Sequence, residues 1–307
     1  MTTPRSILIA TDFSAGAALA ASRAATLARE LGIDDLRQLH VVEAPWLGTL
    51  QQWFGLAEAS RQGLVDEAGR SMAGAVAAIE KEAGCKPAGS VVVGNLLDTL
   101  VEQAGQADLL VIGARGQHPV RDFAVGTTGE RLLRKRRGPI LVVRGRPVRP
   151  YRRVMAPVDF SPHGLQVLRH ATAIAPGAQV DLLHAFEVPF ESKLRFAGVS
   201  EEEIHRLRVH ARAQAVDGVA KLLAQAGVDA ARVHRRIEHG YAPRVIVDAA
   251  RHDDADLIVI GKHGESIVED LLLGSVTLHV LGQARCDVLV VSAPQTGAAQ
   301  SSNGSPT

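Results

Sequence analysis

The chain has 307 residues, enough for two domains of about 150 residues that each bury their own core. Its 34 Lys and Arg residues nearly balance its 33 Asp and Glu residues, and its two cysteines are too few for a disulfide framework or a zinc-ligand cluster. No apolar run approaches the roughly 20 residues that a membrane span requires, and the apolar stretch at 7–10 is too short for a signal peptide. We therefore expect a cytoplasmic protein without membrane contact.

Both halves of the chain alternate short β-rich runs with helical stretches, which predicts α/β domains with parallel sheets. Each half should contain five strands and four helices. The first half has expected strands at 6–11, 37–42, 90–93, 109–112 and 140–144, and expected helices at 15–31, 58–83, 96–106 and 127–136. The second half has expected strands at 153–158, 179–186, 233–238, 257–260 and 288–292, and expected helices at 164–174, 200–226, 243–251 and 275–283.

Prolines and arginines interrupt both periodicities at 145–150, which places the domain boundary there. We expect domains at residues 1–146 and 151–293, followed by a disordered tail at 294–307 that is rich in Gly, Ser, Gln and Pro. Many basic residues cluster between Arg131 and Arg153. We interpret this cluster as a helix end, whose dipole favours cations, followed by a charged linker. The alternative is a phosphate or polyanion patch, but nucleic acid is not an expected partner.

One glycine spacing occurs twice, each time where an apolar strand ends. The first copy has glycines at 113, 116 and 126, and the second has them at 261, 264 and 274, so the spacing from 113 to 261 is 148 residues. A glycine loop between a strand and a helix allows backbone N–H groups to surround a phosphate. Two further pairs support an internal duplication: Asp-Phe-Ser begins at Asp12 and at Asp159, and Leu-His begins at Leu39 and at Leu183. Parallel strands bring all these segments to one edge of the sheet, where ligands bind.

These segments resemble the universal stress protein family, in its tandem UspA-like, nucleotide-binding branch, which carries G-x2-G-x9-G-[ST] and an Asp after the first strand. The resemblance covers nearly the whole chain. It implies two tandem Rossmann-like domains of the adenine nucleotide alpha hydrolase type, with ATP as the usual ligand, with or without Mg²⁺. It also implies that the domains pair through their last strands, so that residues 140–144 would meet residues 288–292.

The same resemblance assigns residues to the nucleotide. Asp12 and Asp159 would meet the ribose or adenine side, Val41 and Ala185 would contact adenine through their backbone, and Ile112 and Ile260 would border the nucleoside. The phosphates would be held by Gly113, Gly116, Gly126, Thr127 and Thr128 in the first half, and by Gly261, Gly264, Gly274, Ser275, Val276 and Thr277 in the second half.

The two copies differ where the helix begins. The second reads Gly-Ser-Val-Thr, whereas the first reads Gly-Thr-Thr-Gly, so Gly129 replaces the last hydroxyl. A lost hydrogen bond costs about 0.5–1.5 kcal/mol, which weakens a site without abolishing it. Arg115 and Arg121 in the first loop are candidates for additional charged contacts with phosphate, whereas the second loop has Lys262 and His263. We favour the second half as the better site and leave occupancy of the first open.

Plain structural interpretations compete with these assignments. The glycine loops can be ordinary turns inherited by duplication, and Asp12 and Asp159 can be helix caps. We interpret His40 and His184 as packed histidines, because no Cys or carboxylate cluster joins them as metal ligands. The aromatic segments 45–56 and 189–197 either cover the edge of the core, which we favour, or form a lid or docking surface.

Motifs for catalysis are absent from the sequence: it has no Gly-x-Ser-x-Gly elbow, no Gly-x4-Gly-Lys-[Ser/Thr] loop and no His-x-Gly-His segment. We therefore expect an ATP-binding regulatory module of the stress response and no catalytic residues. The alternatives are a slow, metal-dependent ATPase that uses Asp159, and a nucleotide-free interaction scaffold. A homodimer and an unidentified regulatory protein partner also remain open.

Overall fold

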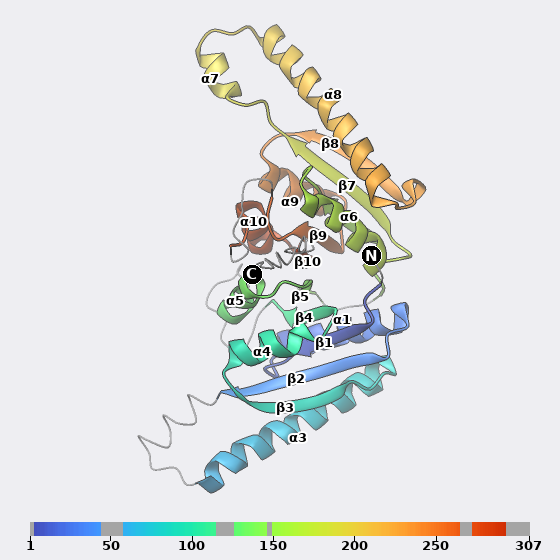
Figure 1. Ribbon diagram of the computed structural model, residues 1–307, viewed down its shortest axis with the longest axis vertical. Helices are drawn as coiled ribbons and strands as arrows, with labels where there is room; N and C mark the ends of the chain where they lie inside the picture. Colours follow the sequence, from blue (N-terminus) through green and yellow to red (C-terminus); the bar gives the residue numbers. More distant parts are fainter. Residues whose placement is uncertain (1–2, 44–57, 115–125, 146–148, 265–271, 293–307) are drawn as a thin grey trace, which may run out of the picture.

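All the described strands join one ten-stranded sheet in the order β3-β2-β1-β4-β5-β10-β9-β6-β7-β8. The structure is a computed structural model that describes residues 3–43, 58–114, 126–145, 149–264 and 272–292. Figure 1 shows the sheet along the long axis of the molecule, with β3 and α3 at one end and β8 and α8 at the other.

The predicted α/β alternation is confirmed in both halves. The first half contains β1 (Ser6–Ala10), α1 (Ala15–Leu31), β2 (Asp35–Glu43), α3 (Glu58–Ala83), β3 (Ala88–Gly94), α4 (Leu96–Gly105), β4 (Leu109–Gly113), α5 (Thr127–Lys135) and β5 (Ile140–Val143). The second half contains β6 (Arg153–Pro157), α6 (Pro162–Ile174), β7 (Gln179–Phe186), α7 (Glu191–Phe196), α8 (Glu201–Ala226), a 3₁₀ turn (Ala230–Arg232), β8 (Val233–His239), α9 (Ala242–His252), β9 (Leu257–Gly261), α10 (Ser275–Gln283) and β10 (Asp287–Val291). The short helix α7 lies where the sequence predicts only a connecting segment.

The two halves pair through their last strands, as predicted. β5 and β10 run antiparallel, and Leu141 lies opposite Leu289, its own counterpart at a spacing of 148 residues. On either side of this pair, Ile140 lies opposite Val290 and Val142 opposite Val288. A local two-fold pseudosymmetry axis therefore passes between Leu141 and Leu289.

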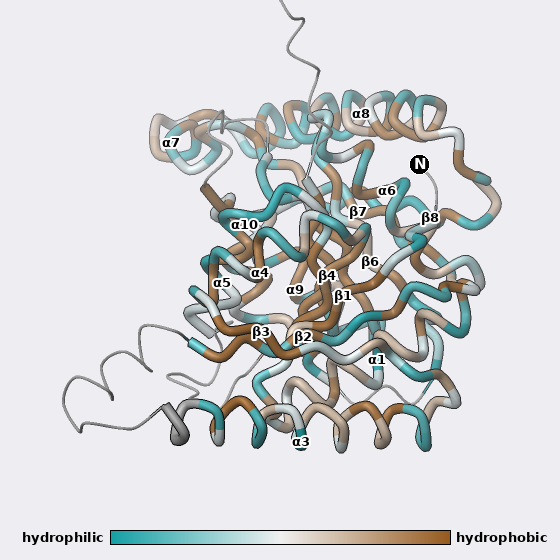
Figure 2. Tube along the Cα trace, turned by 60° about the horizontal axis from the view of Figure 1, so that its bottom comes forward, coloured by the Kyte–Doolittle hydropathy of each residue, from teal (hydrophilic) through white to brown (hydrophobic). Residues whose placement is uncertain are grey.

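Helices cover both faces of the sheet, and each face carries one apolar core that includes residues of both halves. One core contains side chains from α1, α6 and α8, and the other contains side chains from α4, α5, α9 and α10. The strands between them are predominantly apolar, as the brown segments in the middle of Figure 2 show. Because strands buried on both faces need continuous apolar runs, LLVIG and LIVIG fit the central strands β4 and β9.

A buried polar cluster fastens the halves together at the amino end of β10. The Asp287 carboxylate, 2% exposed, accepts hydrogen bonds from Arg23 Nε at 3.0 Å, from the Tyr151 hydroxyl at 2.7 Å and from the Arg144 backbone N–H at 2.8 Å. The Arg23 guanidinium also lies 4.1 Å from the centre of the Tyr151 ring and donates to the Arg149 carbonyl. Helix α1 of the first half is thereby tied to β10 of the second.

Candidate functional site

A cavity opens at the carboxyl ends of β6, β7 and β9, and all the second-half residues that the resemblance assigns to the nucleotide line it. They are Asp159, Ala185, Ile260, Gly261, Gly264, Gly274, Ser275, Val276 and Thr277. The strand order places β6 between β7 and β9, so the ends of these three strands lie side by side. The structure thus brings together segments that are more than 100 residues apart in the chain.

Asp159 shapes the turn that leads from β6 into α6. Its Oδ1 accepts the Ser161 N–H at 3.2 Å and the Ser161 hydroxyl, while Ser161 itself is the N-cap of α6. Asp12 accepts the Ser14 N–H at 3.0 Å in the same way, and Ser14 caps α1. The capping interpretation is therefore wrong in detail, because each aspartate lies two residues before the capping position and forms a side-chain turn there.

The second carboxylate oxygen of Asp159 lies beside the glycine loop. A Cβ on Gly264 would be 3.0 Å from Asp159 Oδ2, and a Cβ on Gly164 would be 2.1 Å from the Asp159 carbonyl oxygen. Both glycines are therefore needed so that α6, the aspartate and the loop can approach each other. Gly164 is a constraint that the glycine spacing alone did not reveal.

Histidines fix the ends of the first two strands of each half, in agreement with the interpretation as packed residues. His184 Nδ1 lies 3.0 Å from the Val158 carbonyl oxygen, and Phe160 stacks on its ring at 4.3 Å. His40 is held equivalently by the Thr11 carbonyl oxygen at 2.8 Å, with a ring next to it. These contacts orient the backbone around Ala185 and Val41.

The last glycine of each spacing has a geometric role, since in each half a backbone hydrogen bond joins it to a residue just after the preceding strand. In the second half, the Gly274 N–H donates to the Lys262 carbonyl at 2.9 Å, and in the first half the Gly126 N–H donates to the Ala114 carbonyl at 3.4 Å. Each hydrogen bond closes the loop directly before its helix begins. The next helix therefore starts at the carboxyl end of the strand that precedes the loop.

Thr277 has a different use from the one expected. Its hydroxyl donates to the Gly261 carbonyl at 2.6 Å, and the residue is 2% exposed. The hydroxyl hydrogen that a phosphate contact would need is thus engaged in tying the start of α10 to the end of β9. Gly129 at the corresponding place in α5 has no side chain for such a contact.

Lys262 likewise does not point toward a phosphate. It is 3% exposed, and its Nζ donates to the Arg134 carbonyl at 2.6 Å, near the carboxyl end of α5 in the other half. A cation at a helix C-terminus is favoured by the free carbonyls and the helix dipole. The expectation of a charged phosphate contact is therefore corrected: Lys262 connects the two halves.

The start of α10 supplies the donors that the cavity offers to an anion. Gly274 is the N-cap residue and lacks a side chain that would cap the helix. The first N–H groups of a helix have no partner within it, so the N–H groups of Ser275 and Val276 are available at the positive end of the helix dipole. The opposite wall of the cavity is apolar and includes Leu183 and Ile260.

The first-half residues lie at the corresponding carboxyl ends. Asp12 follows β1, Val41 is near the end of β2, Ile112 and Gly113 end β4, Gly126 caps α5, and Thr127 and Thr128 begin it. Gly116, Arg115 and Arg121 lie outside the described residues. A Cβ on Gly113 would be 2.6 Å from the Gly16 carbonyl oxygen, so the backbone of α1 closes directly onto β4.

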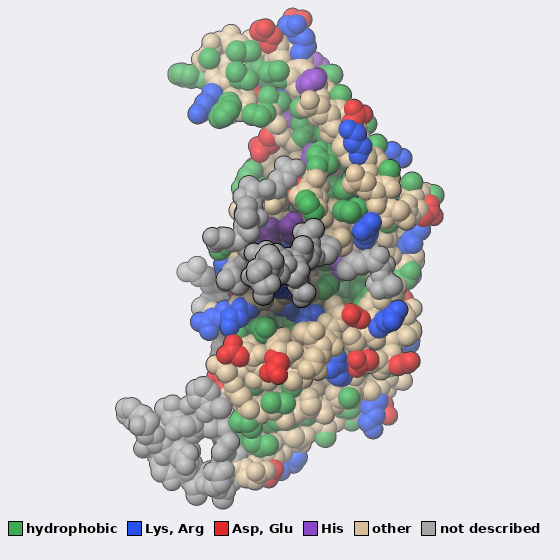
Figure 3. All heavy atoms as spheres, in the orientation of Figure 1, with side chains coloured by type: hydrophobic (Ala, Val, Ile, Leu, Met, Phe, Trp, Pro, Cys, Tyr) green, Lys and Arg blue, Asp and Glu red, His purple; other side chains and the backbone are tan. Residues whose placement is uncertain are grey.

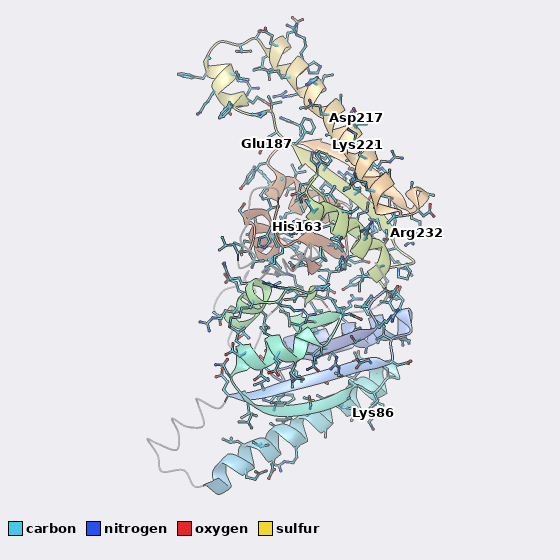
Figure 4. All side chains as sticks on the ribbon, in the orientation of Figure 1. Lys86, His163, Glu187, Asp217, Lys221 and Arg232 are labelled. Atoms are coloured by element: carbon cyan, nitrogen blue, oxygen red, sulfur yellow. The ribbon has the colours of Figure 1, made fainter. Side chains whose placement is uncertain are left out.

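Several lining residues were missed by the sequence reasoning, among them His163 from α6 and Ala242 and Ile246 from α9. The His163 ring lies beside the ring of His263 in the glycine loop, with centres 5.7 Å apart. Figure 3 shows histidine side chains gathered near the middle of this face, and Figure 4 labels His163 there. The first half has Gly16 at the position equivalent to His163. This difference between the two copies is the sequence signal that could have identified His163.

The aromatic segment 189–197 does not cover the core. Phe190 is 69% exposed and Phe196 is 95% exposed, and both belong to α7 and its N-cap. The favoured interpretation is wrong for these two residues. The aromatic residues of 45–56 lie outside the described part of the chain.

In the part of the chain that the structure describes, no three His, Cys, Asp or Glu side chains gather in a way that would hold a metal ion. No helix there combines the length and apolar character that crossing a bilayer requires.

Fold and site together define an α/β protein of duplicated domains with a glycine-loop cavity at the carboxyl ends of the second-half strands. The chain belongs to the universal stress protein family, whose family profile matches residues 4–144 and 150–292. Universal stress protein MJ0531 of Methanocaldococcus jannaschii is 33% identical over 147 residues, covering 47% of this chain and 84% of the relative. A universal stress protein of Mycolicibacterium smegmatis is 28% identical over 196 residues, covering 63% of this chain and 64% of the relative.

Solved structures share the tandem arrangement over nearly the whole chain. A universal stress protein from Archaeoglobus fulgidus matches with a TM-score of 0.65 at 17% identity, covering 94% of this chain and 99% of the other. A putative universal stress protein from Pseudomonas aeruginosa matches with a TM-score of 0.60 at 18% identity, covering 94% and 93%. At these identities the likeness concerns the fold.

Proposed function

We propose that this protein binds an adenosine nucleotide, ATP, in the second-half cavity and acts as a cytoplasmic regulatory module of the stress response. The observation that supports this most is the convergence of nine sequence-selected residues around one cavity. An apolar wall, a carboxylate and a helix start lie there together. These correspond to the three parts of a nucleotide, namely the base, the ribose and the phosphates.

Each part of the cavity has a matching chemical task. Leu183 and Ile260 provide apolar surface for the planar base, and the backbone of Ala185 can hydrogen-bond to its edge. The Asp159 carboxylate can accept hydrogen bonds from ribose hydroxyls. The N–H groups at the start of α10 would receive the phosphates. Mg²⁺, where present, would supply charge neutralisation of the phosphates.

Calorimetric titration of the full chain with ATP tests the proposal, with and without Mg²⁺, after native mass spectrometry of the purified protein. Gly274→Val places a branched side chain at the helix start and is expected to weaken ATP binding at least tenfold. Gly126→Val is the matched control, because Gly126 occupies the same place in the first half and has no atom within 4 Å of an added Cβ.

The outcomes separate the candidate functions. Absence of ATP binding at millimolar concentration refutes the proposal and leaves the nucleotide-free scaffold. Loss of binding in Gly126→Val but not in Gly274→Val would move the site to the first half. Sustained turnover that stops when divalent ions are removed would favour the slow ATPase, with Asp159 as the residue to substitute next.

The regulatory part of the proposal requires that ATP bind one arrangement of the protein better than another. Lys262 and Gly274 belong to one loop closure, and Lys262 also reaches α5 of the other half. Nucleotide at the start of α10 would therefore bias contacts between the halves. Hydrogen exchange of α5 with and without ATP measures this, and identical exchange would argue against coupling.

A further inference from the structure

Helix α8 has a second apolar side besides the one through which it packs on the sheet. The packed side includes the buried residues Ala215, Val219 and Leu222, which belong to the same core as side chains of β7 and β8. Figure 1 shows α8 along one end of the molecule, with its first turns extending beyond the strands. An apolar side on a helix at such a place is exposed to water unless a partner covers it.

The second apolar side, which we call the α8 seam, follows a regular spacing. It consists of the exposed residues Val209, Ala213, Val216 and Ala220. Its two valines are 55% and 45% exposed, and its spacing of 4, 3 and 4 residues is that of the contact line of a coiled coil. By the 3.6-residue period, Gly218 lies on the opposite side of the helix, where an added Cβ would be 2.5 Å from the Phe160 ring. The α8 seam therefore points away from this contact.

The equivalent helix of the first half has charged residues where the α8 seam begins. α3 and α8 both have 26 residues, and a spacing of 143 residues aligns the buried positions of one with those of the other. At this spacing Val209 takes the place of Asp66, and Ala213 takes the place of Arg70. Charged side chains are the usual occupants of an exposed helix side. The α8 seam is therefore particular to the second half and is not a feature that both helices share.

We propose that two copies of this chain associate through their α8 seams, as an antiparallel pair of helices about a two-fold axis. This arrangement places Val209 opposite Ala220 of the other copy, and Ala213 opposite Val216. Every layer then combines one valine with one alanine, so side chains of different size face each other across the interface. A parallel pair would place valine on valine and alanine on alanine, which leaves gaps in alternate layers. In the antiparallel register residues 203–226 overlap, over about 36 Å of helix.

Charges beside the α8 seam are complementary in the same register. His210 lies opposite Asp217 of the other copy, and Arg206 lies about one turn from the same carboxylate. Arg206 also lies opposite Lys221 of the other copy, but Glu203 is within about one turn of that ammonium group. All five side chains are exposed, and Figure 4 labels Asp217 and Lys221 on α8. Because the apolar layers and the charges both match when one sequence pairs with itself, the partner that fits is a second copy of this chain.

Sedimentation velocity of the full chain over a range of concentrations tests the proposal, and we expect a monomer–dimer equilibrium in the micromolar range. Val209→Asp introduces the residue that α3 has at this place, and the two-fold axis brings it into the interface twice, so the dimer should weaken at least tenfold. Leu207→Asp is the matched control, because it introduces the same residue at an exposed apolar position on another side of α8. It should leave the dimer unchanged, and circular dichroism checks that both variants fold.

An exchange of charges tests the register of the pair. His210→Glu places a carboxylate opposite Asp217 of the other copy, and Asp217→Lys places an ammonium group opposite His210, so each substitution alone should weaken the dimer at least threefold. The double variant with both substitutions again has opposite charges at these positions and should recover the affinity of the wild type.

Three outcomes would overturn the proposal. A wild type that stays monomeric up to the millimolar range would leave the α8 seam to a different protein. A dimer that Val209→Asp does not weaken would have to form through another surface. A double charge variant that dimerises no better than its two single variants would exclude the antiparallel register.

Discussion

Removal of the Asp287 carboxylate is expected to destabilise the whole chain strongly. Asp287→Ala leaves the Arg23 charge buried, with its side chain 7% exposed, and deprives the Tyr151 hydroxyl of its acceptor. Breaking a buried ion pair by removing one partner costs about 3–5 kcal/mol, which is a large part of the 5–15 kcal/mol that typically stabilises a folded protein. We expect a loss in this range in the free energy of unfolding.

Urea unfolding followed by circular dichroism measures the loss. The control is Asp248→Ala, because the ion pair of Asp248 with Arg244 has an N–O distance of 3.6 Å and an Asp248 side chain that is 60% exposed. Such an exposed pair contributes about 0–1 kcal/mol. Asp287→Asn keeps one acceptor oxygen but replaces the other with an NH2 group and loses the charge, so its stability should fall between those of the wild type and Asp287→Ala.

A double variant distinguishes an ion-pair effect from a packing effect. Arg23→Met combined with Asp287→Leu removes both charges and retains apolar volume, so its cost should be clearly smaller than the sum of the two single substitutions. The reasoning would be refuted if Asp287→Ala cost less than about 1 kcal/mol. Additive costs in the double variant would refute it as well.

Three further expectations concern other sites. Burial raises the pKa of the Cys286 thiol to about 12. Its alkylation by iodoacetamide at pH 8, followed by mass spectrometry, should therefore be about a thousandfold slower in the folded chain than in guanidinium. Equal alkylation rates in the two states would contradict this prediction. Gly164→Ala should lower the unfolding free energy by about 1–3 kcal/mol, because the added Cβ would lie 2.1 Å from a carbonyl oxygen, whereas Gly177→Ala, with no atom within 4 Å of the added Cβ, should have little effect in the same urea assay. A hydrogen bond from Arg208 lowers the pKa of Glu191 to about 2. The stabilisation that the Glu191 carboxylate gives to the packing of α7 on α8 is therefore fully present above about pH 4.5 and is lost only as the pH falls through about 2. A Glu191 titration near pH 4.5 in NMR spectra would disprove this prediction.

The elements of the fold were largely predictable because the apolar runs and their breakers are strong signals. α1 and α3 begin and end where the sequence predicts, and β7 does as well. Strand ends such as that of β3, which extends to Ala88 and Gly94, are set by pairing with β2. Pairing depends on a neighbour that the local sequence does not reveal, so such ends shift by one or two residues.

Nine residues of the second-half cavity were predictable, because duplication points to the same positions twice. The hydrogen-bond partners of individual side chains were not predictable. The positions of Thr277 and Lys262 near the loop suggested phosphate contacts. In the structure the Thr277 hydroxyl donates to the Gly261 carbonyl, and Lys262 Nζ donates to a carbonyl of α5 in the other half. Both partners are carbonyl oxygens, and the sequence carries no signal for which carbonyl a side chain will meet.

Duplication followed by divergence explains why equivalent positions of the two halves differ at both ends of their strands. At the carboxyl ends, the second half has Thr277 and His163 where the first half has Gly129 and Gly16, so side chains that the first half does not possess support the second-half cavity. At the amino ends, the second half has Asp287, which binds Arg23 and Tyr151, whereas the first half has Pro139 at the equivalent position. Because β5 and β10 run antiparallel, these two positions lie on opposite edges of the sheet. The polar cluster that joins the halves is therefore formed on one side of the pseudosymmetry axis, and Pro139 has no carboxylate with which to form a second one.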